Sequence, residues 1–171
     1  MTEHKIKQSV RRFLPLVVVA MLLILTACSS IDCPLNNRVY TQYALLTPDG
    51  KTDTMKLSMT ISTNRLDGDD SVLINKDVDV TAFSLPISNA QPRDSFFLEL
   101  ASDDASTLDT VVVSKIDHMH FESTDCAPSY FHELQSVSTT HHAIDSVVIK
   151  NHEVNYDTSK KHFCIYFTPR R

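Results

Sequence analysis

The 171-residue chain has only 2 glycines and no tryptophan, and 8% of its residues are aromatic. The shortage of glycine argues against flexible linkers and against glycine-rich phosphate-binding loops. Without tryptophan, a carbohydrate-binding surface would lack its best stacking residue. The chain also contains no Gly-x-Ser-x-Gly, His-Glu-x-x-His or Walker motif. We therefore expect a protein that is not an enzyme and that needs no cofactor.

Basic residues are scarce beyond the N-terminal region. The chain carries 16 basic and 21 acidic residues, of which 4 basic and 1 acidic fall within residues 1–27. The 12 basic and 20 acidic residues that remain give residues 28–171 a net charge of −8. Because nucleic acid binding depends on basic patches, we predict no nucleic acid partner.

The N-terminal region is typical of a bacterial lipoprotein signal peptide. Basic residues precede an apolar stretch over residues 13–25, which is too short to be a good permanent membrane-spanning helix. The next residues complete the lipobox Leu-Thr-Ala-Cys, in which a diacylglycerol is attached to Cys28 before the chain is cleaved in front of it. The sequence thus predicts a signal peptide over 1–27, a lipidated N-terminus and short tether over 28–36, and a folded domain over 37–171.

The predicted lipid also indicates where the protein acts. Two or three acyl chains hold a protein stably to a membrane, whereas one does so only marginally. The residue after Cys28 is Ser29 rather than Asp, so retention in the inner membrane is not indicated. The single nearby acidic residue, Asp32, is a poor signal for export to the cell surface. We expect anchoring in the outer membrane, facing the periplasm.

Three cysteines remain after Cys28 is assigned to the lipid: Cys33, Cys126 and Cys164. Export places them in an oxidising compartment, where one disulfide and one free thiol are expected. We favour a Cys33–Cys126 disulfide, which would connect the start of the domain to a late loop. The alternative pairs Cys126 with Cys164 and leaves Cys33 free in the tether.

After the tether, the sequence predicts short strands almost throughout. Apolar and polar residues alternate in many of them. Residues 38–47 and 53–62 flank the tight turn Pro-Asp-Gly-Lys at 48–51 and are expected to form a hairpin. Residues 130–138 are ambiguous between a strand and a helical turn. The other expected strands are 72–75, 78–87, 94–101, 110–116, 118–123, 144–150 and 162–168.

Eight or nine such strands predict an all-β fold. We expect an antiparallel β-sandwich, immunoglobulin-like or jelly-roll-like, rather than a barrel. Two facing sheets suit short strands that each have one apolar face.

One pair of histidines has the spacing of metal ligands. His118 and His120 would lie on the same side of a strand, about 6–7 Å apart. The pair would bind zinc or copper if a third ligand, such as His132, Glu122 or His141, folded across. The alternative interpretation is a solvated face of a strand on which histidine is merely tolerated.

Two further groups of residues suggest chemistry. Tyr40, Phe97 and Tyr166 would form a sugar-stacking platform if the fold exposed them together. His162 and Cys164 lie on one face of the last strand and resemble a Cys–His nucleophile pair. A packed or disulfide-bonded Cys164 is the simpler interpretation.

Several segments resemble a known family. They are Cys28 followed closely by Cys33-Pro34, the strand 109–113 leading to the Cys126 loop, and the closing stretches 144–151 and 163–167. Together they resemble the small uncharacterised lipoproteins of Bacteroidota, which carry a domain of unknown function. The resemblance implies a β-sandwich lipoprotein whose gene often lies near that of an outer-membrane β-barrel, and it implies no activity.

The chain departs from this family pattern in Ala127, where glycine is more usual, in Cys164 and in its histidines. A metal site at His118 and His120 therefore gains no support from the family. We expect a non-catalytic accessory or scaffold protein of an outer-membrane β-barrel. The alternative is a ligand-binding lipoprotein, for a metal or for a glycan.

Overall fold

The structure of the protein, a computed structural model, describes residues 33, 38–64 and 70–168. The predicted signal peptide, the lipidation site Cys28 and most of the predicted tether lie outside the described residues. The described part is all β, with two sheets that pack against each other, so the predicted β-sandwich is confirmed. Within these ranges, no helix is long and apolar enough to cross a membrane.

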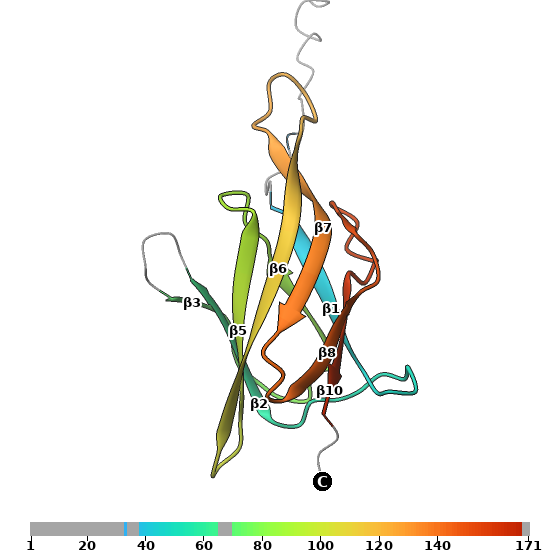
Figure 1. Cartoon of the computed structure of the whole chain (residues 1–171). Helices are drawn as coiled ribbons and strands as arrows, with labels where there is room; N and C mark the ends of the chain where they lie inside the picture. Colours follow the sequence, from blue (N-terminus) through green and yellow to red (C-terminus); the bar gives the residue numbers. More distant parts are fainter. Residues whose placement is uncertain (1–32, 34–37, 65–69, 169–171) are drawn as a thin grey trace, which may run out of the picture. The chain divides into compact units, whose positions relative to one another are not determined.

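Ten strands make up the described part of the chain (Figure 1). They are β1 (Tyr40–Leu46), β2 (Ser58–Asn64), β3 (Asp70–Asp77), β4 (Ala82–Pro86), β5 (Arg93–Ala101), β6 (Ser106–His120), β7 (Ser129–Thr139), β8 (Ile144–Ile149), β9 (Glu153–Val154) and β10 (Phe163–Phe167). A four-stranded sheet has the order β4-β1-β10-β8, and a six-stranded sheet has the order β3-β2-β5-β6-β7-β9.

The core between the sheets follows from period-two alternation along the strands. Phe96, Leu98 and Leu100 of β5 are buried, as the sequence predicts, and so are Val111 and Val113 of β6. The intervening residues of both strands are less buried. The six-stranded sheet therefore presents one apolar face to the four-stranded sheet.

Three aromatic rings stack in the four-stranded sheet. The ring of Tyr43 lies 4.8 Å from the ring of Phe83 and 4.8 Å from that of Phe163, centroid to centroid. The three residues meet because Tyr43 of β1 pairs with Phe83 of β4 and with Phe163 of β10. Burial raises the pKa of Tyr43 well above its usual range. A void beside these rings has room for about one water and is lined by aromatic and aliphatic side chains.

The predicted hairpin between residues 38–47 and 53–62 forms only next to its turn, where Leu46 bridges Thr52 and the Asp53 amide donates to the carbonyl oxygen of Leu45; the pairing of the two full strands is wrong. The tight turn at 48–51 does form, and Gly50 adopts the positive φ of 77° expected there. However, β1 pairs with β4 and β10, whereas β2 lies between β3 and β5 in the other sheet. The chain after the turn crosses between the sheets, and Met55, which is fully buried, packs into the core on the way.

The sandwich departs from a purely antiparallel one at a single pair within the described part. β1 and β10 pair in parallel, with Tyr43 opposite Phe163 and Leu46 opposite Tyr166. A parallel pair needs a long connection. Since these are the first and last strands, the rest of the domain provides that connection.

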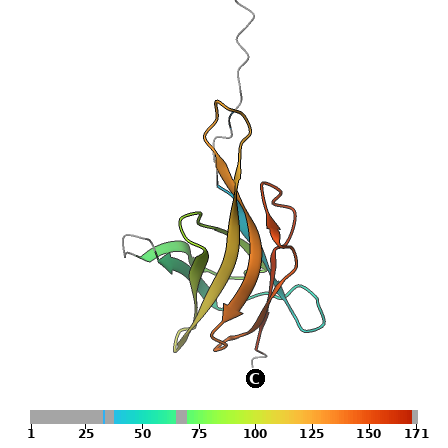
Figure 2. The same cartoon turned by 45° about the horizontal axis from the view of Figure 1, so that its top comes forward.

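β6 and β7 are longer than the sequence predicts. Residues 118–120 continue β6 rather than forming a separate strand, and residues 129–139 form one strand with no helical turn. Pairing between β5 and β6 ends at Ser114, whereas β6 and β7 pair as far as His120. β9 pairs with β7 at His132 and Glu133. Beyond that pairing, β6, β7 and their loop continue without a third strand, as both views show (Figure 1, Figure 2). We call residues 117–131 the β6–β7 extension.

Candidate functional site

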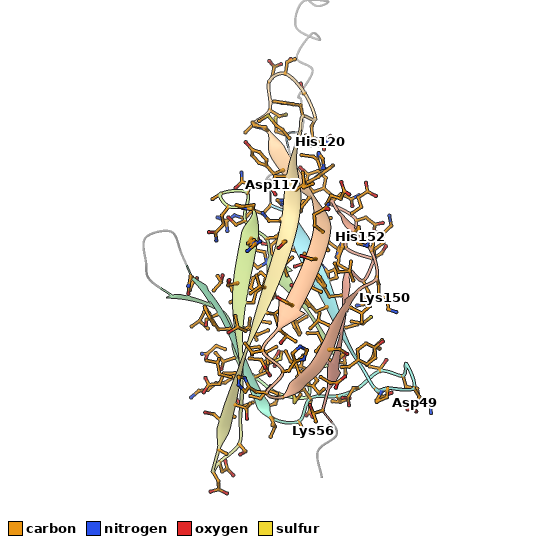
Figure 3. The ribbon with its side chains drawn as sticks, viewed as in Figure 1. Asp49, Lys56, Asp117, His120, Lys150 and His152 are labelled. Atoms are coloured by element: carbon orange, nitrogen blue, oxygen red, sulfur yellow. The ribbon has the colours of Figure 1, made fainter. Side chains whose placement is uncertain are left out.

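The predicted metal ligands His118 and His120 lie on the β6–β7 extension, where Figure 3 labels His120. Their side chains point to the outward side of β6 and are 58% and 38% exposed. Each faces a carboxylate. His118 Nε2 lies 3.5 Å from Glu133 Oε2, and His120 Nε2 lies 3.1 Å from Glu122 Oε1.

The other suggested ligands do not join the two histidines into one site. His132 is buried, and its Nδ1 lies 2.7 Å from Asp117 Oδ1 on the inward side of the sheet. His141 donates from Nδ1 to the carbonyl oxygen of Asp145 at 2.7 Å. Across residues 33, 38–64 and 70–168, no group of three or more His, Cys, Asp and Glu side chains is placed to hold a metal ion.

Aromatic and apolar side chains gather on the same extension. The ring of His120 stacks on that of Phe131 at 4.2 Å, and Tyr156 meets Phe131 edge-on at 5.1 Å. Met119 and Phe121 are 55% and 58% exposed. The extension thus combines a packed aromatic cluster with apolar side chains that face solvent.

The three aromatics considered for sugar stacking do not form one platform. Tyr40 and Tyr166 lie on β1 and β10 of the four-stranded sheet, whereas Phe97 lies on β5 of the six-stranded sheet. All three are half-buried. The glycan hypothesis therefore loses the surface on which it was based.

The cysteines are arranged as the favoured prediction had them, with one disulfide and one free thiol. Cys33 and Cys126 form a disulfide, and Cys164 is free and buried. Burial raises the pKa of the Cys164 thiol, which lowers its nucleophilicity at neutral pH. His162 accepts a hydrogen bond at Nδ1 from the Gln42 amide and donates from Nε2 to the carbonyl oxygen of Glu153. Both ring nitrogens of His162 thus bind backbone groups, and the residue is placed as a structural side chain.

A buried charged cluster lies where the extension joins the sheet. The side chain of Lys115 is 0% exposed and that of Asp94 is 6% exposed. Lys115 Nζ donates to Asp117 Oδ1 at 3.0 Å and to the carbonyl oxygen of Gln91 at 2.7 Å. His132 completes the cluster through Asp117. Burial lowers the pKa of His132, although the neighbouring Asp117 acts to raise it. The imidazole ring is therefore neutral when it donates to the Asp117 carboxylate.

Sequence reasoning missed this cluster, although one signal was present. Along β6, Lys115 and Asp117 follow Val111 and Val113 at the same two-residue spacing. These charged residues therefore occupy inward positions, where ionised side chains are rarely found unless they are paired.

A second buried carboxylate, Asp109, binds the turn between β7 and β8. Its Oδ1 accepts from the His142 amide at 2.7 Å, and its Oδ2 accepts from the amides of Ala143 and Ile144 at 2.7 and 2.9 Å. The Thr140 hydroxyl also donates to Oδ1, at 2.8 Å. This arrangement is a structural clamp, since every acceptor site is used by the chain itself.

Comparison with protein families matches residues 58–167 to a family model described as "Family of unknown function (DUF6452)". The matched range runs from the start of β2 to the end of β10. Comparison with curated proteins and with solved structures gives no match.

Proposed function

This chain belongs to the family of unknown function DUF6452, and we propose that it is a lipid-anchored protein of the bacterial cell envelope that works through protein contact. Its role is that of a non-catalytic accessory or scaffold of an outer-membrane β-barrel. The observation that carries this proposal is the exposed apolar surface of the β6–β7 extension.

The extension has the properties of a contact element. Met119 and Phe121 are more than half exposed, and Ile116, just before the extension, is 49% exposed on the opposite side of β6. Soluble proteins rarely expose clusters of large apolar side chains except at surfaces that bind a partner or ligand. A two-stranded ribbon also has few neighbours within its own sheet, so a partner can reach both of its faces.

The Cys33–Cys126 disulfide supports the proposal that the partner is a membrane protein. Cys33 lies five positions after the predicted lipidation site Cys28. Its disulfide partner Cys126 lies in the loop of the β6–β7 extension. A lipid on Cys28 would therefore keep the tip of the extension within a few residues of the membrane surface, where an integral membrane partner is accessible.

In-cell crosslinking and affinity capture of the tagged, full-length protein from the native envelope test the proposal. We expect recovery of one membrane β-barrel protein, and loss of that recovery when Cys28→Ala removes the lipid. The double variant Met119→Ser, Phe121→Ser should reduce recovery by about tenfold or more, since buried apolar anchors dominate contact surfaces.

Leu108→Ser is the matched control, because Leu108 is 53% exposed at the opposite end of β6. It should leave the recovery unchanged. Equal capture by the wild type and the Met119/Phe121 double variant would contradict the assignment of the extension. Capture of no specific protein by the lipidated wild type would contradict the accessory role itself.

A further inference from the structure

The buried cluster at the base of the extension brings an amine and a carboxyl group together away from water. Asp94 of β5 pairs with Val113 of β6, so Lys115 is its diagonal neighbour on the same face of the sheet. Lys115 Nζ lies 3.5 Å from Asp94 Oδ2. The two side chains are 0% and 6% exposed.

The two carboxylates around Lys115 are not equivalent. Asp117 Oδ1 accepts hydrogen bonds from Lys115 and His132, whereas Asp94 Oδ2 is buried and has no hydrogen-bond partner. Burial raises the pKa of Asp94 to about 6, despite the opposing charge of Lys115. Asp94 is thus the carboxyl group that more readily takes up a proton, and Asp117 is the one whose oxygen is hydrogen-bonded to the amine.

We propose that Lys115 and Asp94 condense into an intramolecular isopeptide bond, with Asp117 as the proton acceptor. Asp117 first takes a proton from the Lys115 ammonium group. The neutral amine then attacks Cγ of the protonated Asp94 carboxyl group, forming the N–C bond. The second amine proton passes through Asp117 to the leaving hydroxyl group as the C–O bond breaks. One water is released, no oxidant is needed, and Asp117 ends the reaction protonated.

The surroundings favour the condensed product. An ion pair removed from water carries a large desolvation cost, and the amide replaces two buried charges with a neutral group. The sheet register holds the reacting groups in contact, and such intramolecular positioning is equivalent to a very high local concentration. The product would link β5 covalently to β6 beside the point at which the β6–β7 extension begins.

Tryptic digestion of the purified, full-length chain, after reduction and alkylation, tests the bond by mass spectrometry. In an unbridged chain, trypsin cleaves after Arg93 and Lys115 and releases peptides 94–115 and 116–150. An acylated Lys115 is not a trypsin site. The bridged chain therefore gives a single peptide, 94–150, that is lighter by one water than the same peptide with an ordinary missed cleavage.

Three variants test the roles of Asp94 and Asp117. Asp94→Asn can form the same amide by releasing ammonia instead of water, so its 94–150 peptide should match the wild-type mass. Asp94→Ala cannot react and should release peptides 94–115 and 116–150. Asp117→Asn removes the proton acceptor, and we expect the bridged fraction to fall at least tenfold in a chain that is still folded by circular dichroism.

The wild-type digest decides the proposal without any variant, so a variant that fails to fold does not obscure the result. Release of peptide 94–115 at its full mass, with no water-loss form of 94–150, would overturn the bond. A bridge that forms completely in Asp117→Asn would overturn the assignment of the proton acceptor.

Discussion

The clamp at Asp109 makes a strong prediction about stability. Its two carboxylate oxygens receive three backbone amides and one hydroxyl, all from residues 140–144. In Asp109→Asn, one of the two oxygens becomes an NH₂ group that faces hydrogen-bond donors. Two of the four bonds are then lost, and each hydrogen bond to a charged group contributes roughly 1.5–3 kcal/mol. We expect the free energy of unfolding to fall by about 3–6 kcal/mol at neutral pH.

The same clamp predicts how this difference depends on pH. Burial alone raises the pKa of Asp109, but the four hydrogen bonds outweigh it and hold the pKa below its usual value. A depressed pKa in the folded state stabilises the protein above the pKa of the unfolded chain, about 3.9. That stabilisation is lost as the pH falls through the folded-state pKa. The gap between wild type and Asp109→Asn should therefore narrow below about pH 4.

Urea unfolding followed by far-ultraviolet circular dichroism measures this effect, since the chain has no tryptophan for fluorescence. Asp104→Asn, in the exposed turn between β5 and β6, is the matched control and should change stability by less than about 0.5 kcal/mol. A loss below about 1 kcal/mol in Asp109→Asn, or a gap that stays constant on acidification, would refute the clamp.

Three further predictions concern the disulfide, the aromatic stack and the free thiol. Reduction of the Cys33–Cys126 disulfide should lower the unfolding free energy by roughly 4–5 kcal/mol in the chain-entropy model; an unchanged urea midpoint would show that the bond adds no constraint. Phe163→Ala, which removes a fully buried ring from its stack, should cost about 3–5 kcal/mol in thermal unfolding, and a cost below about 1 kcal/mol would argue against the packed stack. Because Cys164 is buried and its pKa is raised, alkylation of the native chain should be on the order of 100-fold slower than in urea; equal rates would contradict its burial.

Local patterns in the sequence were sufficient to predict much of the fold. The alternation of Phe96, Leu98 and Leu100 predicted the inward face of β5, and the structure buries all three. Such alternation is a local property, because neighbouring side chains in a strand point to opposite faces. The Cys33–Cys126 pairing, now found in the structure, was likewise favoured from the small number of available thiols.

Strand pairing was harder to predict, because it depends on the whole sheet. The turn around Gly50 has the expected backbone geometry, and turn chemistry alone suggests that its two flanks pair. The flanks pair only at Leu46 and Thr52. The aromatic side chain of Tyr43 stacks between β4 and β10, which keeps β1 in the four-stranded sheet. β2 lies in the six-stranded sheet, and its apolar face packs into the core from that side. No local signal in the sequence shows whether the segments on either side of the turn pair with each other or join different sheets.

The polar sites show a further limit, and also how a sequence can reveal them. The inward positions of β6 run from Asp109 through Val111 and Val113 to Lys115 and Asp117. An apolar run bounded by charged residues at the same spacing predicts that those charges are buried and that each needs a partner. The partners themselves come from other elements, the backbone of the β7–β8 turn at one end and strands β5 and β7 at the other. Their identity therefore depends on the register between strands, which only the assembled sheet defines.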